Sequence, residues 1–188
     1  MDEHGLLDAL EALGDLLESR NENADLAVIG GGALLLAGFI ERPTRDLDAV
    51  ALHSEGHLTS AHPLPESLQR AVHDVGRAYG LALNWLNGGP TDLLRMGLPT
   101  GFLERATKLQ FSALVVRVAG RLDQIHFKLY AAVDQGPRSK HMQDLKRLEP
   151  TASELTSAAA WCQTHDPSEG FAAMLKQTLE ALGISRDG

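Results

Sequence analysis

The segment of residues 28–50, VIGGGALLLAGFIERPTRDLDAV, constrains the fold more than any other part of the chain. Residues 24–29 are apolar and predict a short buried strand, which the glycines Gly30–Gly31–Gly32 then break. Residues 33–39 predict a helix, and residues 46–52 predict a second strand. A strand, a glycine turn, a helix and a strand in direct succession are typical of a fold that mixes helices with a sheet.

The hydrophobic pattern places further elements on both sides of this segment. Helices are predicted over 6–17, 66–79, 121–134, 139–148, 151–164 and 168–182. Further strands are predicted over 81–86, 102–111 and 113–120, with a turn at Ser112–Ala113, and a polar loop over 53–65. The pair Thr151 and Glu154 has the spacing of a helix capping box.

The order of these elements predicts an α+β fold, in which a small mixed sheet is flanked by helices and followed by a helical C-terminal part. We expect an α/β core over 1–135 and C-terminal helices over 136–188 that pack on it. No run of about 18 apolar residues exists, so no membrane span is expected.

Composition narrows the class of protein. Cys162 is the only cysteine, which excludes an internal disulfide and a zinc site built on several thiolates. The start of the chain is acidic and lacks the basic region of a signal peptide, so a cytoplasmic location is expected. The net charge of −8 disfavours binding to nucleic acid by phosphate contacts alone. Lys and Arg nevertheless gather in residues 117–147, where a local basic surface could form.

Asp46 and Asp48 are the most informative charged pair. Residues two apart on a strand project to the same face, so two like charges would repel each other there. A Mg²⁺ ion, or Mn²⁺ in its place, resolves this repulsion because it prefers carboxylates together with substrate phosphates. The glycines at the preceding junction would let a phosphate approach free backbone N–H groups. The plainer alternative is a solvated pair of aspartates beside an ordinary turn.

The segment GGGALLLAGFIERPTRDLDAV resembles the core signature of the nucleotidyltransferase superfamily of polymerase-beta-like proteins. Its R-x-T-x-D-L-D part is most similar to the AbiEii/MenT-type toxin nucleotidyltransferases and their uncharacterised relatives. Three later segments resemble theirs in the same order: Trp85-Leu86-Asn87, FKLYA at 127–131 and KHMQDLKRL at 140–148. The resemblance extends over residues 27–148.

The resemblance implies a role for each matching residue. Gly30 and Gly31 would cradle the nucleotide phosphates, Asp46 and Asp48 would bind Mg²⁺, and Lys128 would contact the triphosphate.

Four further residues would complete this site. Asp144 would act as metal ligand, as base or as the residue that orients Lys128. Arg42, Thr44 and Arg45 would bind phosphate or hold the carboxylates. The chain departs from the superfamily in two ways: the strand predicted over 113–120 offers no third carboxylate, and Gly32 stands where many members have a serine or another small residue.

The resulting prediction is a Mg²⁺-dependent nucleotidyltransferase that transfers a nucleoside monophosphate from an NTP to an acceptor hydroxyl. By resemblance the acceptor would be a tRNA 3′ end or a protein side chain, and the chain could be the toxin of a pair with a cognate antitoxin. Two alternatives stay open: a catalytically inactive binding module with the same fold, and a structural protein. A zinc site at the loop histidines His53, His57 and His62 is a weaker alternative, since their spacing matches no standard motif.

Overall fold

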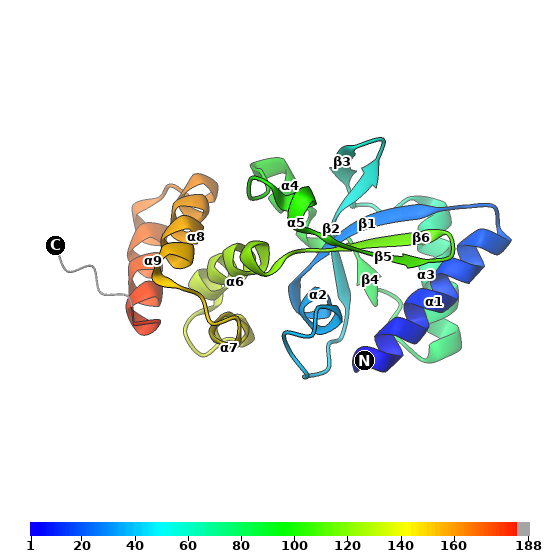
Figure 1. The fold of residues 1–188 in the computed structure, drawn as a ribbon, viewed down its shortest axis with the longest axis horizontal. Helices are drawn as coiled ribbons and strands as arrows, with labels where there is room; N and C mark the ends of the chain where they lie inside the picture. The colour runs from blue at the N-terminus through cyan, green and yellow to red at the C-terminus, as the bar shows by residue number, and fades with distance from the viewer. Residues whose placement is uncertain (184–188) are drawn as a thin grey trace. The chain divides into compact units, whose positions relative to one another are not determined.

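The computed structural model describes residues 1–183 and confirms the α+β class. The chain divides into two compact units, Met1–Gly120 and Arg121–Gly188, which Figure 1 shows in successive colours. In the described chain, all strands belong to the first unit. The predicted boundary between residues 135 and 136 falls one helix later than this division, at the end of α6.

The first unit contains a mixed sheet in the order β3-β2-β1-β6-β5, to which β4 adds beside β2. β1 pairs antiparallel with β2 and parallel with β6, so the sheet combines both kinds of ladder. β4 lies parallel to β2, whereas the β2–β3 and β5–β6 pairs are antiparallel. The strands are β1 (Ala24–Ile29), β2 (Leu47–Ser54), β3 (His57–Ser60), β4 (Leu86–Asn87), β5 (Thr107–Phe111) and β6 (Leu114–Val118).

A β-bulge interrupts the pairing of β1 with β2. Ala27 lies opposite Ala51, but the next residue, Val28, lies opposite Ala49. The extra residue on β2 changes the face to which the start of that strand points. As a result, Asp48, which pairs with Ile29, lies on the same face of the sheet as Ala27 and Ala51.

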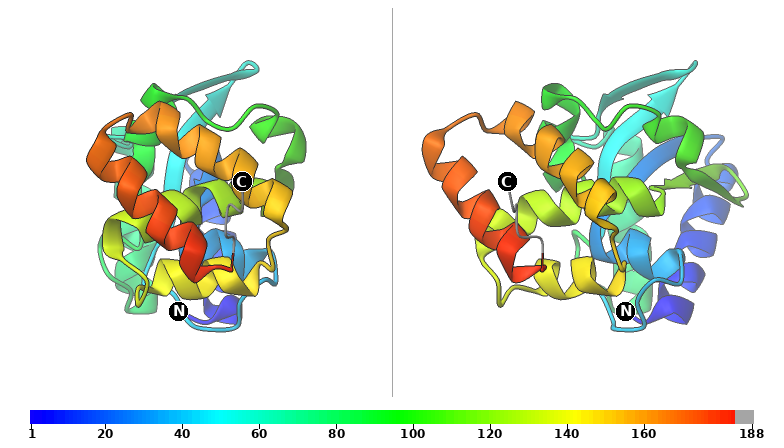
Figure 2. Two further views of the ribbon diagram at one scale, coloured as in Figure 1. Left: turned by 90° about the vertical axis from the view of Figure 1, so that its left-hand side faces the viewer. Right: turned by 60° about the vertical axis from the view of Figure 1, so that its left-hand side comes forward.

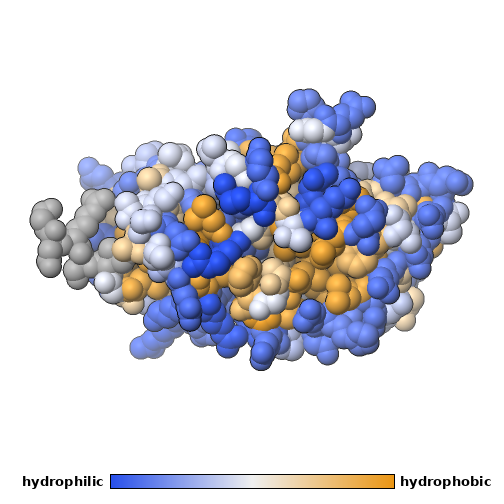
Figure 3. All heavy atoms as spheres, viewed as in Figure 1, coloured by the Kyte–Doolittle hydropathy of each residue, from blue (hydrophilic) through white to orange (hydrophobic). Residues whose placement is uncertain are grey.

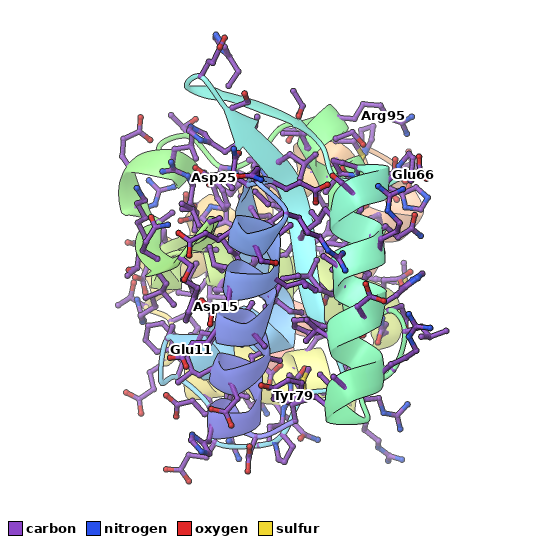
Figure 4. All side chains as sticks on the ribbon, turned by 90° about the vertical axis from the view of Figure 1, so that its right-hand side faces the viewer. Glu11, Asp15, Asp25, Glu66, Tyr79 and Arg95 are labelled. Carbon is purple, nitrogen blue, oxygen red and sulfur yellow. The ribbon has the colours of Figure 1, made fainter. Side chains whose placement is uncertain are left out.

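Two helices, α1 (Glu3–Ser19) and α3 (Glu66–Tyr79), lie side by side in front of the sheet in Figure 4. Their apolar faces are buried, and Glu11 and Asp15 belong to the polar face of α1. At Gly14 the helix approaches β5 so closely that an added Cβ would lie 2.0 Å from the carbonyl oxygen of Phe111. Glycine is therefore required at this crossing.

Four short helical segments complete the first unit: α2 (Gly30–Leu36), the 3-10 turn η1 (Gly89–Thr91), α4 (Asp92–Met96) and α5 (Phe102–Arg105). α2 packs on β1 and β2, and α4 packs on β2 and η1. Hydrophilic side chains cover the tip of the β2–β3 hairpin, whereas hydrophobic residues gather over α2 and the neighbouring strands (Figure 3).

The second unit is helical, with α6 (Arg121–Gln135), α7 (Lys140–Arg147), α8 (Ala152–His165) and α9 (Glu169–Ala181). α6 contacts each of the other three, and α8 and α9 lie side by side in both views of Figure 2. The predicted capping box is confirmed: Thr151 and Glu154 each bond the backbone N–H of the other. Aromatic rings of α6 and α8 meet around Trp161, which contacts Phe127 and Tyr130 edge-on, and Phe171 of α9 packs against Tyr130.

Most predicted helices and strands are confirmed, and three assignments are wrong. The polar stretch 53–65 contains β3, which is stabilised by pairing with β2 rather than by apolar residues. The strand predicted over 102–111 begins with a helical turn, Phe102–Arg105, before β5. The strand predicted over 81–86 is reduced to the two residues of β4. Among the described residues, no helix is both long and apolar enough to span a membrane.

Candidate functional site

The glycine turn lies at the end of β1, where Gly30 has a φ of +79°. This left-handed conformation favours glycine because a Cβ would clash with the following peptide. The sequence predicted that the three glycines precede the helix. In the structure they form the first turn of α2 instead. Tertiary packing overrides their low helix propensity, since Gly32 and the residues after it are buried.

Gly30 lies directly against the carboxylate of Asp48. An ideal Cβ on Gly30 would lie 2.9 Å from Oδ2 of Asp48 and 3.8 Å from its Cβ. This contact follows from register, because Asp48 is the antiparallel partner of Ile29, the residue before Gly30. The glycine turn and the second aspartate of D-x-D therefore converge in space.

The next two glycines face the segment that leads into β2. A Cβ on Gly31 would lie 3.3 Å from Oγ1 of Thr44 and 3.6 Å from Nη2 of Arg42. A Cβ on Gly32 would lie 2.9 Å from the carbonyl oxygen of Asp46 and closer still to the side chain of Leu47. Side chains at these positions would push the D-x-D segment away from α2.

Thr44 is a buried link within this segment. It is 7 % exposed, and its hydroxyl donates to the carbonyl oxygen of Asp46 at 3.0 Å. Its own backbone exchanges two hydrogen bonds with Met1. Asp46 lies just before β2 and is half-buried, like Arg42, whereas Arg45 is exposed. The structure thus brings Gly30, Gly31, Asp48, Thr44 and Arg42 together with the backbone of Asp46, and it leaves Arg45 at the surface.

Asn87 also belongs to the site, although the sequence prediction assigned no role to it. Nδ2 of Asn87 donates to Oδ1 of Asp48 at 3.2 Å, because β4 lies parallel to β2 with these two residues in register. Trp85, just before β4, is fully buried and anchors this strand through its Nε1, which donates to the carbonyl of Val72. The Trp-Leu-Asn resemblance is the sequence signal that could have identified Asn87.

Lys128 and Asp144 belong to the second unit, where they form an ion pair between α6 and α7. Nζ of Lys128 lies 2.8 Å from Oδ2 of Asp144, and the two side chains are 2 % and 1 % exposed. A buried charge requires such a partner because desolvation of either ion alone is costly. The ion pair bears on one of the predicted roles of Asp144, that of orienting Lys128, and this role stays a prediction. The contact of Lys128 with a triphosphate stays a prediction.

A second polar cluster joins three neighbouring strands of the first unit. Nε and Nη2 of Arg117 on β6 each donate to Asp25 on β1 at 2.8 Å, and Nδ1 of His53 on β2 lies 3.0 Å from the same carboxylate. The hydrogen bonds to Asp25 raise the pKa of Arg117. Within residues 1–183 no three His, Cys, Asp or Glu side chains are placed to hold a metal ion, so the alternative of a zinc site at the loop histidines is not supported.

The site residues fit a divalent cation that also binds phosphate. Asp46 and Asp48 carry carboxylates, whose hard oxygens are the donors that Mg²⁺ prefers, and Oδ2 of Asp48 lies against the turn at Gly30, where no side chain intervenes. Mg²⁺ is commonly bound by one or two carboxylates together with substrate phosphates, so two carboxylates are sufficient.

Comparison with known proteins identifies the family of the chain. A search of curated proteins and a search of solved structures each gave no match. A family model described as "Nucleotidyltransferase of unknown function (DUF6036)" matches residues 4–147. The match contains both the glycine turn with its aspartates and the Lys128–Asp144 pair. The chain therefore belongs to the DUF6036 family of nucleotidyltransferases of unknown function.

Proposed function

We propose that the protein is a Mg²⁺-dependent nucleotidyltransferase that transfers a nucleoside monophosphate from an NTP to an acceptor hydroxyl. The observation that carries this proposal is the contact of Gly30 with Asp48, which sets a bare backbone turn against a carboxylate that can bind a cation. The family assignment supports the same class of reaction. The substrates and the metal are parts of the proposal.

In the proposed reaction, the backbone at Gly30 and Gly31 binds the phosphates of the NTP, and Asp46 and Asp48 hold the cation. Mg²⁺ would neutralise phosphate charge and polarise the α-phosphoryl group. The acceptor oxygen bonds to the α-phosphorus, and the bond from this phosphorus to the oxygen that bridges to the β-phosphate breaks. Pyrophosphate leaves, and the hydroxyl proton passes to a carboxylate or to water. Positioning and charge neutralisation account for most of the rate enhancement in such transfers.

Labelled-nucleotide transfer tests this proposal. The full chain is incubated with each of the four NTPs labelled at the α-phosphate, with Mg²⁺ and total RNA, and labelled RNA and self-labelled protein are scored separately. Asp46→Asn and Asp48→Asn keep the side-chain shape but remove the charge, so each is expected to lower transfer at least about 100-fold.

Asp92→Asn is the matched control, because Asp92 is an exposed aspartate on α4 of the same unit. It is expected to leave transfer unchanged. Full transfer by folded Asp48→Asn protein would contradict the site assignment. Binding of an NTP without transfer to any acceptor would favour the inactive binding module instead.

The finer part of the proposal concerns the acceptor and the biological role. By the resemblance to AbiEii/MenT-type toxins, the acceptor is a tRNA 3′ end or a protein side chain, and a cognate antitoxin restrains the activity. Induced expression in a bacterial host is expected to arrest growth with the wild-type chain but not with Asp48→Asn. Equal growth of both strains at equal protein levels would argue against a toxin.

A further inference from the structure

Asn87 occupies a fixed orientation beside Asp48. Its Nδ2 donates to Oδ1 of Asp48 at 3.2 Å, while its own Oδ1 accepts from the backbone N–H of Gly89 at 2.8 Å. A backbone N–H can pair with the amide oxygen but not with the amide NH₂ group. The contact with Gly89 therefore defines which way the amide points, and it directs the NH₂ group to the carboxylate.

The turn that carries Asn87 is attached closely to the sheet. A Cβ on Gly88 would lie 2.0 Å from the carbonyl oxygen of Ala61, and a Cβ on Gly89 would lie 2.8 Å from Oδ1 of Asn87. The hydroxyl of Thr91 donates to the carbonyl of Val50 on β2 at 3.1 Å and accepts from the N–H of Ala61 at 3.0 Å. The turn that follows Asn87 is therefore held against Ala61 and Val50 by contacts that do not involve the side chain of Asp48.

We propose that Asn87 is a positioning residue that holds Asp48 in the orientation in which it binds a divalent cation, and that it limits the site to one protein-bound cation. This inference rests on the proposed function of the same site. An amide orients the carboxylate without adding negative charge. Its NH₂ group also places partial positive charge next to Oδ1 of Asp48, where it disfavours a second cation.

A Mn²⁺ titration of the full-length protein tests this inference without any need for turnover. Electron paramagnetic resonance measures the free Mn²⁺ that remains, and the bound amount follows by difference. The double variant Asp46→Asn/Asp48→Asn measures how much Mn²⁺ binds to other acidic surfaces, and this amount is subtracted from that of each other protein. After subtraction, the wild type is expected to bind one Mn²⁺ per chain. Asn87→Ala is expected to weaken this binding about tenfold, as is common when a residue that orients a metal ligand is removed.

Two further variants make the test specific. Asn84→Ala is the matched control, because Asn87 contacts only the backbone carbonyl of this exposed residue. It is expected to bind Mn²⁺ like the wild type. Asn87→Asp keeps the shape but places a third carboxylate beside Asp48, so Mn²⁺ is expected to raise its melting temperature more than that of the wild type.

The outcomes separate this inference from the proposed function. Unchanged Mn²⁺ affinity in folded Asn87→Ala protein, or two specific ions in the wild type, would overturn the inference alone. A smaller thermal response of Asn87→Asp than of the wild type would also count against it. If the wild type binds no more Mn²⁺ than the double variant, the proposed metal site fails and the inference fails with it.

Discussion

Gly30 and Asp48 are in such close contact that an ideal Cβ on the glycine would lie 2.9 Å from Oδ2 of the aspartate. Gly30 directly follows β1 and Asp48 lies on β2, and the antiparallel register of these two strands brings the residues together. The contact joins the position proposed for phosphate with the position proposed for the cation. The effect of a side chain at Gly30 on Asp48 can therefore be tested separately from the backbone strain that any residue with a positive φ would introduce.

Gly30→Ala is expected to lower nucleotide transfer at least about tenfold, because the new methyl group displaces the Asp48 carboxylate from its place. The left-handed φ of +79° adds a loss of stability of about 1 kcal/mol. Gly38→Ala is the matched control, since Gly38 has a φ of +71° but nothing lies within 4 Å of its ideal Cβ. Thermal melting and transfer assays of both variants check this. Equal loss of activity in the two variants would show that backbone strain alone is responsible.

The Lys128–Asp144 pair predicts strong coupling between two substitutions. Either Lys128→Met or Asp144→Asn leaves one buried partner of a 2.8 Å ion pair, so each is expected to lower the free energy of unfolding by about 3–5 kcal/mol. The double variant is expected to lose clearly less than the sum of the two. Denaturant titrations of the four proteins measure the coupling.

The same four proteins test the predicted functional role of Lys128. If the double variant recovers stability but not nucleotide transfer, the Lys128 ammonium group or the Asp144 carboxylate has a function beyond the ion pair. Recovery of both properties would identify the pair as structural.

The stability of the second unit is expected to depend on Glu154 at acid pH. Hydrogen bonds from Arg121 and from the backbone of Thr151 lower the pKa of Glu154 to about 2. Because the folded pKa lies below the ordinary value of 4.5, its stabilisation is fully present above pH 4.5 and is lost as the pH falls toward 2.

Glu154→Gln should therefore destabilise the protein at pH 7, by about 2 kcal/mol, and the difference from the wild type should shrink below pH 4.5. Circular dichroism melts from pH 7 to pH 3 measure this difference. Glu169→Gln is a control in the first turn of α9, where the residue is exposed. A constant difference across this pH range would contradict the assigned role of Glu154.

Cys162 provides a chemical probe of the same unit. Burial raises the pKa of its thiol to about 12, and the side chain is 0 % exposed. We expect the native protein to react very slowly with a thiol reagent at pH 8 and the urea-unfolded protein to react at the ordinary rate, because only the thiolate is reactive. Rapid labelling of the native protein would mean that α8 opens readily.

Features determined by neighbouring residues could be predicted from the sequence. The helix Glu66–Tyr79 and the capping box at Thr151 agree with their predicted positions, since periodicity and end signals lie within each segment. β3 could not be predicted in this way. Its four residues are mostly exposed, and only their pairing with β2 makes them a strand.

The same distinction applies to the site. Gly30, Asp46 and Asp48 were identifiable because a single segment of sequence contains the turn, the helix and the start of β2. Asn87 lies 39 residues from Asp48, and its contact depends on the parallel pairing of β4 with β2. A two-residue strand leaves almost no hydrophobic pattern, so only the structure shows that Asn87 belongs with the aspartates.

The bulge opposite Ala27 has a consequence for how this part of the chain can vary in length. Because the side of a strand alternates at every residue, one further residue between Asp48 and Ala51 that did not bulge out would turn Asp48 toward the opposite surface of the sheet, whereas removal of the bulged Val50 would leave Asp48 opposite Ile29 in a regular ladder. Insertions in the β2–β3 hairpin beyond Ser54 do not change the face to which Asp48 points. Homologues that keep the chemistry should thus tolerate hairpins of many sizes, and between Asp48 and Ala51 they should either keep the extra residue with its bulge or lose both together.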